Sequence, residues 1–133
     1  GICVIDLDTV MPGLSINDFG DSIRFGANHS AEDERDLSKV NFDLPLFDIY
    51  TKGFLEGAAG TLTDAEKEYL PWGAKLMTLE CGIRFLTDYL EGDTYFKIHR
   101  DGQNLDRCRT QFKLVADMEN VWDEMASIVK KYS

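Results

Sequence analysis

The stretch that decides the fold is ICVIDLD at residues 2–8, a short apolar run that ends in two acids. Such a run predicts a strand that is buried on both faces. An acid at the carboxyl end of a buried strand lies where α/β folds hold phosphate-bearing ligands, so Asp6 is the most informative residue. The rest of the chain is almost wholly helical, and a buried strand needs partners for its backbone groups. We therefore expect this chain to be part of a larger protein.

Asp6 and Asp8 are two residues apart, and side chains at this spacing point to the same side of a strand. Carboxylate oxygens are the ligands that hard cations such as Mg²⁺ prefer, so the pair predicts a magnesium site. An Asp close to Pro12 and Gly13 is also typical of a turn cap. The spacing alone leaves both interpretations open.

Composition and charge narrow the range of partners. Acids outnumber bases by 24 to 14, which gives a formal charge of -10. A chain of this charge repels nucleic acid and anionic membrane surfaces, so neither is expected as a partner. No stretch reaches the roughly 18 apolar residues of a membrane-spanning helix, and the first residues lack the basic flank of a signal peptide. These features predict a cytoplasmic protein, and 133 residues suffice for one core.

Apolar residues recur at helical spacing through most of the remaining chain, which predicts a mainly α fold. Capping residues mark several helix starts: Asn17 or Asp18, then Asp43, and Thr63 with Glu66 in a capping box. The last helix is expected to be the longest unbroken one. In chain order, the expected helices span residues 17–26, 30–39, 44–59, 63–70, 72–90 and 104–131.

The helix expected over 72–90 carries an apolar stripe at helical spacing, and we predict that this stripe is buried. Glycines near the end of the 44–59 helix are interpreted as packing and stop signals, because they permit the close approach of another helix. The members of the stripe are Leu76, Leu79, Ile83, Leu86 and Leu90, and the glycines are Gly53, Gly57 and Gly60.

Other residues are of types that could carry chemistry. Asp18 and Asp21 lie one turn apart near a helix start, where the helix dipole stabilises carboxylates, so a structural role is favoured over a catalytic one. The spacing of Glu80, Arg84 and Asp88 predicts an ordinary salt-bridged ladder. Aromatic side chains stack on sugars but also fill cores. The aromatic candidates are Trp72, Phe85, Tyr89, Tyr95 and Phe96.

Four segments together resemble a known superfamily of kinases. VIDLDTVMPG at 4–13 and DFGDSIR at 18–24 resemble the aminoglycoside phosphotransferase and choline kinase superfamily just after its catalytic loop. LECGIRFLTDYL at 79–90 and RTQFKLVADME at 109–119 look like the bacterial N-acetylhexosamine 1-kinases, and the likeness runs nearly end to end. The resemblance implies a protein-kinase-like fold and ATP-dependent phosphorylation of the anomeric hydroxyl of N-acetylglucosamine or N-acetylgalactosamine.

Roles for individual residues follow from the same resemblance. Asp6 matches the magnesium-binding Asp that bridges the nucleotide phosphates, and Asp8 would be a second metal ligand. Asp18 matches the acid that braces the catalytic loop from the following helix, which is a structural role. The residues implied to contact the sugar are Arg84, Tyr95, Trp72 and Tyr89.

The superfamily also needs an N-terminal lobe with a phosphate-binding Lys, and a catalytic loop that supplies the base. Neither segment is present in this sequence. The resemblance therefore implies the C-terminal part of a protein-kinase-like α+β fold, inactive alone, whose partners are a sugar, Mg²⁺, ATP and the missing N-terminal part. Residues 1–15 would be a strand and metal-binding loop remnant of the C-lobe, and residues 16–133 a helical substrate-binding subdomain.

Two alternatives remain open from the sequence. A kinase of the same fold could act on another small alcohol, such as an aminoglycoside, choline or homoserine, because fold does not determine substrate. The chain could instead be a non-catalytic helical interaction module, whose apolar strand pairs with the sheet of a partner.

Overall fold

The computed structural model describes residues 1–133 and is mainly helical, as predicted, with 63% of residues in helices and none in a strand. None of the helices combines the length and the apolar character that crossing a membrane requires. The α-helices are α1 (Ser15–Gly26), α2 (Leu44–Gly57), α3 (Asp64–Glu68), α4 (Leu70–Leu90), α5 (Gln103–Asn120) and α6 (Trp122–Tyr132), and the 3-10 helix η1 spans Leu37–Lys39.

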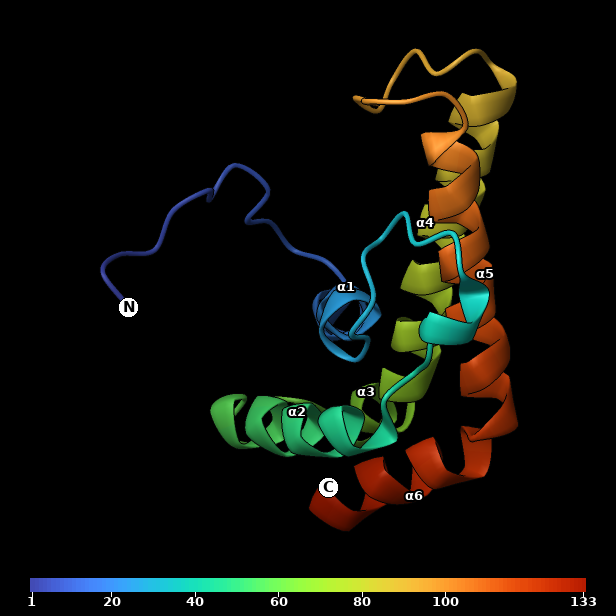
Figure 1. Cartoon of the computed structure of the whole chain (residues 1–133). Helices are drawn as coiled ribbons and strands as arrows, with labels where there is room; N and C mark the ends of the chain where they lie inside the picture. The colour runs from blue at the N-terminus through green and yellow to red at the C-terminus, as the bar shows by residue number, and fades with distance from the viewer.

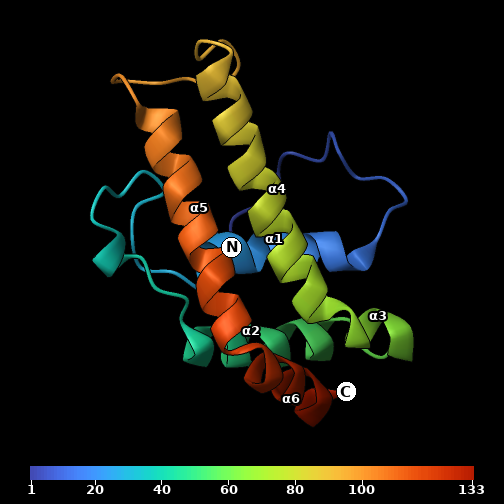
Figure 2. The ribbon, with the colours of Figure 1, turned by 90° about the vertical axis from the view of Figure 1, so that its right-hand side faces the viewer.

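The helices α4 and α5 lie side by side and run in opposite directions along the length of the molecule (Figures 1 and 2). α1 crosses α4 on one side of this pair, and α2 and α6 pack together at the end where α5 finishes (Figure 1). A loop at residues 91–102 joins α4 to α5 at the opposite end. The α4–α5 pair is therefore the frame on which the other helices rest.

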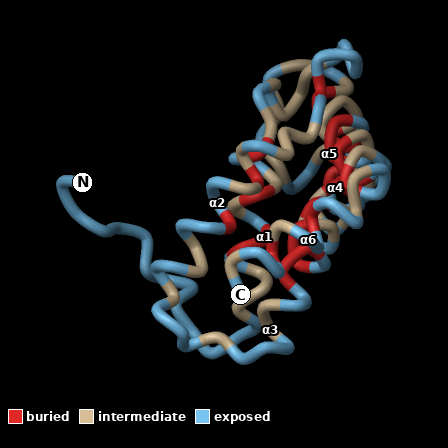
Figure 3. Tube along the Cα trace, turned by 90° about the horizontal axis from the view of Figure 1, so that it is seen from below, coloured by how far each residue is buried: buried red, intermediate tan, exposed pale blue.

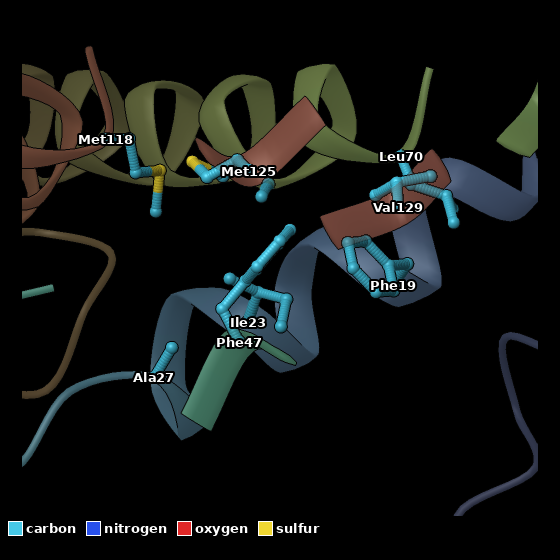
Figure 4. Close-up of a cluster of buried hydrophobic side chains, with 9 residues drawn as sticks. Phe19, Ile23, Ala27, Phe47, Leu70, Met118, Met125 and Val129 are labelled. Carbon is cyan, nitrogen blue, oxygen red and sulfur yellow. The ribbon is translucent and has the colours of Figure 1, made fainter. Parts of the chain in front are cut away.

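The core lies where α1, α2 and α6 meet the lower halves of α4 and α5 (Figures 3 and 4). Phe19 of α1 is fully buried, and its ring centroid lies 5.8 Å from that of Phe47 and 5.1 Å from that of Phe54. Edge-to-face contacts of this kind stabilise aromatic clusters beyond the area they bury. The nine buried members are Phe19, Ile23, Ala27, Phe47, Leu70, Ala74, Met118, Met125 and Val129.

Glycines allow α1 and α5 to approach α4 closely. A Cβ atom at Gly20 would lie 2.2 Å from the Gly73 carbonyl oxygen, and one at Gly73 would lie 2.2 Å from the Ile16 carbonyl oxygen. Gly82 faces Phe112 of α5, whose ring would lie 2.7 Å from an added Cβ. An added Cβ at Gly53, Gly57 or Gly60 would meet nothing within 4 Å, so the prediction that these glycines pack against another helix is wrong. The prediction that they mark the end of the helix agrees with the structure, because α2 ends at Gly57.

The strand predicted over residues 2–8 is not formed, and this part of the predicted fold class is wrong for the chain as described. Residues 1–14 are exposed and extend away from the helices (Figures 1 and 3). Ile2 is 104% exposed and Val4 81% exposed, although both are apolar. A strand forms only when neighbouring strands take up its backbone hydrogen bonds, and this chain supplies no such neighbour.

Three helix predictions also need correction. The last helix is not unbroken: the backbone leaves helical geometry at Val121, and α6 turns so that Met125 and Val129 enter the core. α1 begins at Ser15 without a side-chain cap, so neither Asn17 nor Asp18 caps it. The polar helix expected over 30–39 is reduced to η1.

The starts of α2 and α3 agree with the prediction. The Asp43 side chain accepts a hydrogen bond from the backbone N–H of Leu46, at 2.8 Å. Thr63 and Glu66 form the reciprocal capping box at the start of α3. These caps involve residues three positions apart, which is why the local sequence is sufficient to predict them.

The apolar stripe of α4 that we expected to be buried is not buried: Leu79 and Leu86 are partly buried, and the other three members are exposed on the outer face. Leu76 is 51% exposed, Ile83 50% and Leu90 73%. The buried face of α4 is the opposite one, and it carries small and polar residues as well as apolar ones. Its buried members are Leu70, Pro71, Gly73, Ala74, Thr78, Gly82, Phe85 and Asp88.

Replacing a glycine at the crossing of α1 and α4 tests its role. Because an added methyl group would clash with backbone atoms, Gly20→Ala and Gly73→Ala are each expected to lower the free energy of unfolding by about 1–3 kcal/mol. The matched control is Gly53→Ala in α2, which adds a methyl group in open space. It should raise the free energy of unfolding by about 0.5–1 kcal/mol, since Ala is the better helix former. Urea denaturation measures both, and equal effects at the three positions would contradict the close-packing argument.

Candidate functional site

A cleft of about 720 Å³ lies between α1, α4, the start of α5 and the loop that joins α4 to α5. We call it the α1–α4 cleft. Glu32, from the loop after α1, and Thr9, from the extended segment, also reach it. Its lining residues are Thr9, Asp21, Arg24, Glu32, Met77, Glu80, Cys81, Arg84, Phe85, Phe96, Lys97 and Arg107.

The cleft is rich in charged side chains of both signs, together with two phenylalanine rings. Hydrogen-bond donors and acceptors beside an aromatic surface suit a polar, uncharged ligand that carries many hydroxyl groups. A strongly cationic or anionic ligand would meet charge of its own sign on one wall. The cations are Arg24, Arg84, Lys97 and Arg107, and the acids are Asp21, Glu32 and Glu80.

Glu32 joins two walls of the cleft. Its carboxylate lies 2.8 Å from Nη1 of Arg24 on α1 and 3.8 Å from Nε of Arg107 on α5. Its backbone carbonyl accepts a hydrogen bond from the Thr110 hydroxyl, at 2.6 Å. Burial acts to lower the pKa of Arg24, yet its hydrogen bonds to Glu32 and Asp21 outweigh burial and raise that pKa. Arg24 therefore stays charged in the wall of the cleft.

Two of the predicted sugar contacts, Arg84 and Tyr95, lie close together at the edge of the cleft. Nη2 of Arg84 lies 3.5 Å from the Tyr95 hydroxyl, at the outer limit of a hydrogen bond. The guanidinium carbon lies 5.7 Å from the Tyr95 ring centroid and 5.4 Å from that of Phe96, which is the range of cation–π contacts. Tyr95 is 73% exposed, so its ring is free to contact a ligand.

A smaller hollow of about 320 Å³ adjoins the same residues on the other side of Arg84. Arg84 and Phe96 line both this hollow and the α1–α4 cleft, so they form the ridge between them. The other residues that line the smaller hollow are Thr87, Asp88, Glu91 and Tyr95.

Asp88 is a buried carboxylate beneath this ridge, and it is only 3% exposed. Its oxygens accept hydrogen bonds from the backbone N–H groups of residues 94–96 and from the Asn104 side chain, at 2.8–3.0 Å. Burial acts to raise the pKa of Asp88, yet these donors outweigh burial and lower the pKa below its usual value. Asp88 is therefore charged at neutral pH and does not join the predicted ladder, whereas Glu80 and Arg84 do pair, at 3.8 Å.

The structure does not bring Trp72 or Tyr89 to this site. Trp72 lies 12 residues before Arg84 on the same helix, about 18 Å away along the axis. Its ring packs edge to face on Trp122, with centroids 4.9 Å apart. Tyr89 lines neither the α1–α4 cleft nor the smaller hollow.

The residues predicted to bind a metal do not form a metal site within this chain. Asp6 and Asp8 lie on the exposed N-terminal segment, and no group of three acidic, histidine or cysteine side chains is placed to hold an ion. Asp6 also adopts a left-handed backbone conformation, with φ of 60°, which a strand residue does not. Asp18 is exposed in the first turn of α1.

Sequence reasoning missed several residues that shape the site. The prediction for Asp88 is a salt-bridged ladder, and position 104 is only the expected start of the last helix, although both side chains are buried. Glu32 and Arg107 had no role assigned to them. The hydrophobic pattern gave no signal for Asp88, because it predicts the opposite face of this helix to be buried. The partners of Glu32 come from distant parts of the chain, so no local pattern reveals them.

The chain matches no protein-family model.

The charge of Asp88 should make the free energy of unfolding depend on pH. Because its pKa is lower in the folded protein than in the unfolded chain, its ionised form stabilises the fold above about pH 4, and this contribution is lost as the pH falls further. The difference in unfolding free energy between the unsubstituted protein and Asp88→Asn should therefore be largest at neutral pH and shrink below about pH 4. Urea denaturation at several pH values measures it, and a difference that is independent of pH would contradict the assignment.

Proposed function

We propose that the chain forms the C-terminal, helical part of an ATP-dependent kinase that phosphorylates the anomeric hydroxyl of N-acetylhexosamines. The observation that carries the proposal is the meeting of Arg84 with Tyr95 and Phe96 at the α1–α4 cleft. The resemblance to the N-acetylhexosamine 1-kinases implies that Arg84 and Tyr95 contact the sugar. They come from different elements, a helix and the loop after it: Arg84 lines the α1–α4 cleft, and Tyr95 lies beside it in the adjoining smaller hollow.

The chemistry of the cleft supports a sugar as substrate. Guanidinium and carboxylate groups bind hydroxyl and acetamido groups through directed hydrogen bonds, and aromatic rings pack against the apolar face of a sugar ring. Arg84 and Glu80 supply a donor and an acceptor on successive turns of α4, and Phe96 supplies a ring beside them. The mixed charges favour a neutral sugar over a cationic aminoglycoside or choline.

The exposed N-terminal segment supports the proposal that the rest of the active site comes from elsewhere in a larger protein. Four apolar side chains, those of Ile2, Val4, Ile5 and Leu7, are between 60% and 104% exposed. Exposing apolar surface of this extent to water is unfavourable, and pairing with a sheet would bury it. Within the proposal, this sheet belongs to a protein-kinase-like fold, which also holds ATP and Mg²⁺. Asp6 and Asp8 remain candidate metal ligands, and Asp18 a bracing residue, in that setting only.

This proposal places the protein in the cytoplasm, where ATP is available.

A non-catalytic interaction module is the second candidate, and the outer face of α4 favours it. Five large apolar residues follow this face at spacings of three, four and seven, and each is at least half exposed. A stripe with this period is typical of helices that pair with another helix. The residues are Tyr69, Trp72, Leu76, Ile83 and Leu90.

Measuring ATP consumption by the full-length protein that contains this chain separates the candidates. With Mg²⁺ present, turnover is expected with N-acetylglucosamine or N-acetylgalactosamine, and not with choline, homoserine or an aminoglycoside. Removing Mg²⁺ with a chelator should abolish it, since phosphoryl transfer needs the charge of the metal. Turnover of another alcohol would change the substrate and keep the reaction. No turnover with any of them would leave the interaction module as the better candidate.

The role of Arg84 is tested in the same assay. Arg84→Ala should raise the KM for the sugar about tenfold or more and change the KM for ATP little, because it removes a charged hydrogen-bond donor from the sugar site alone. The matched control is Lys75→Ala, which removes a cation from the same helix but outside both hollows. If both variants change the sugar KM equally, Arg84 is not a sugar contact.

A further inference from the structure

The loop between α4 and α5 forms one wall of the α1–α4 cleft but has no regular secondary structure of its own. It carries Tyr95 and Phe96, the two rings that lie against Arg84. A loop without helix or strand hydrogen bonds needs other contacts to hold one conformation. The source of those contacts therefore determines the shape of the cleft.

Asp88 binds the part of the loop that carries the two rings. Its Oδ1 accepts hydrogen bonds from the backbone N–H of Thr94, at 2.9 Å, and of Tyr95, at 2.8 Å. Its Oδ2 accepts from the N–H of Phe96, at 3.0 Å. Three consecutive backbone groups of the loop are thus bound to one side chain. The two residues whose rings lie against Arg84 are among these three.

Asn104 completes the arrangement from the first turn of α5. Its Nδ2 donates to Asp88 Oδ2 at 2.8 Å and to Asp93 Oδ1 at 2.9 Å, and its Oδ1 accepts from Nη1 of Arg107 at 2.9 Å. The same Arg107 nitrogen lies 3.2 Å from the carbonyl oxygen of Lys97. Asn104 is fully buried, and no buried side-chain N or O atom of the protein lacks a partner. Residues 93–97 of the loop are therefore bound by one connected set of hydrogen bonds.

The position of Asp88 within α4 is unfavourable for a carboxylate, so its charge needs stabilising contacts from outside the helix. It lies two residues before the end of α4, where the helix dipole disfavours a carboxylate. Burying a charge there is costly unless it is hydrogen-bonded. Hydrogen bonds from the backbone N–H groups of the loop offset that cost. The charge of Asp88 and the conformation of the loop therefore depend on each other.

We infer that Asp88, held by Asn104, is a positioning residue for the sugar site: it keeps Tyr95 and Phe96 against Arg84 and thereby sets the affinity for the sugar. The inference rests on the function proposed above. Asp88 lies beneath the ridge, so it acts through the loop and takes no part in the reaction.

Replacing the Asp88 carboxylate by an amide tests whether its hydrogen bonds to the loop set the affinity for the sugar. A carboxylate accepts at both oxygens, whereas an amide accepts at one and presents N–H groups at the other. In Asp88→Asn, either the Thr94 and Tyr95 donors or the Phe96 and Asn104 donors would face an amide N–H. The side chain keeps its size, so packing of the helix is preserved while the loop loses its anchor.

The experiment measures steady-state kinetics of the full-length protein with N-acetylglucosamine and ATP varied separately. Asp88→Asn is expected to raise the KM for the sugar about tenfold to a hundredfold, the cost of a misplaced contact, and to leave the KM for ATP within about twofold. The matched control is Thr78→Val, which removes a buried hydrogen bond from the same helix, 2.8 Å to the Ala74 carbonyl, and does not touch the loop. Thr78→Val should lower stability without changing the sugar KM.

A double-mutant cycle shows whether Asp88 acts through Tyr95. Tyr95→Ala removes the ring that the loop positions, so adding Asp88→Asn to it should raise the sugar KM much less than Asp88→Asn does alone. Should Asp88→Asn fail to fold, Asp93→Gly replaces it. That variant breaks the Asn104 contact at a residue with φ of 59°, where Gly is favoured, and should raise the sugar KM with little loss of stability.

An unchanged sugar KM in these variants, fully additive effects with Tyr95→Ala, or an equal rise in Thr78→Val would overturn the positioning role while leaving the kinase proposal intact. Absence of turnover by the unsubstituted protein with every sugar would overturn the proposed function, and this inference with it. The two failures are therefore distinguishable in one set of measurements.

Discussion

The close crossing of α1 over α4 is the contact on which both the core and the candidate site depend. Gly20 and Gly73 leave no room for a side chain, so the two helix backbones nearly touch. From this contact, Phe19 turns into the core, while Asp21 and Arg24 turn toward the α1–α4 cleft. A larger separation of the helices would open the core on one side and move the charged wall of the cleft on the other. This one steric constraint therefore determines both the packing of the core and the position of the charged wall of the cleft.

The same constraint explains why the most apolar face of α4 is not its buried face. Helices that pack this closely need small residues at the contact, and α4 supplies Gly73 where α1 crosses it and Gly82 where α5 packs on it. A hydrophobic pattern favours large residues, so it assigned the buried face to the stripe through Ile83. Burial on α4 follows from the size of the side chains as much as from their hydrophobicity.

Whether a feature could be predicted from sequence depends on how far apart its interacting residues lie along the chain. The caps at Asp43 and Thr63 involve neighbours three positions away, and both agree with the structure. The strand at 2–8 needed partners from another sheet, and the break at Val121 depends on where α6 finds the core, so both were mispredicted. For the site, the resemblance selected Arg84 and Tyr95, which do converge. The carboxylate beneath them was missed because its partners follow it by six to 16 residues.

The cleft and the core are stabilised by different forces, and this separation matters for function. Apolar contacts around Phe47 and Met118 hold the lower end of the molecule together. The walls of the cleft are instead joined by hydrogen-bonded charges, which run from Asp88 through Asn104 and Arg107 toward Glu32. Charged hydrogen bonds are directional, so they define positions more sharply than apolar packing does. Because few of these charges lie in the apolar core, the shape of the cleft can change by substitution without the loss of the fold.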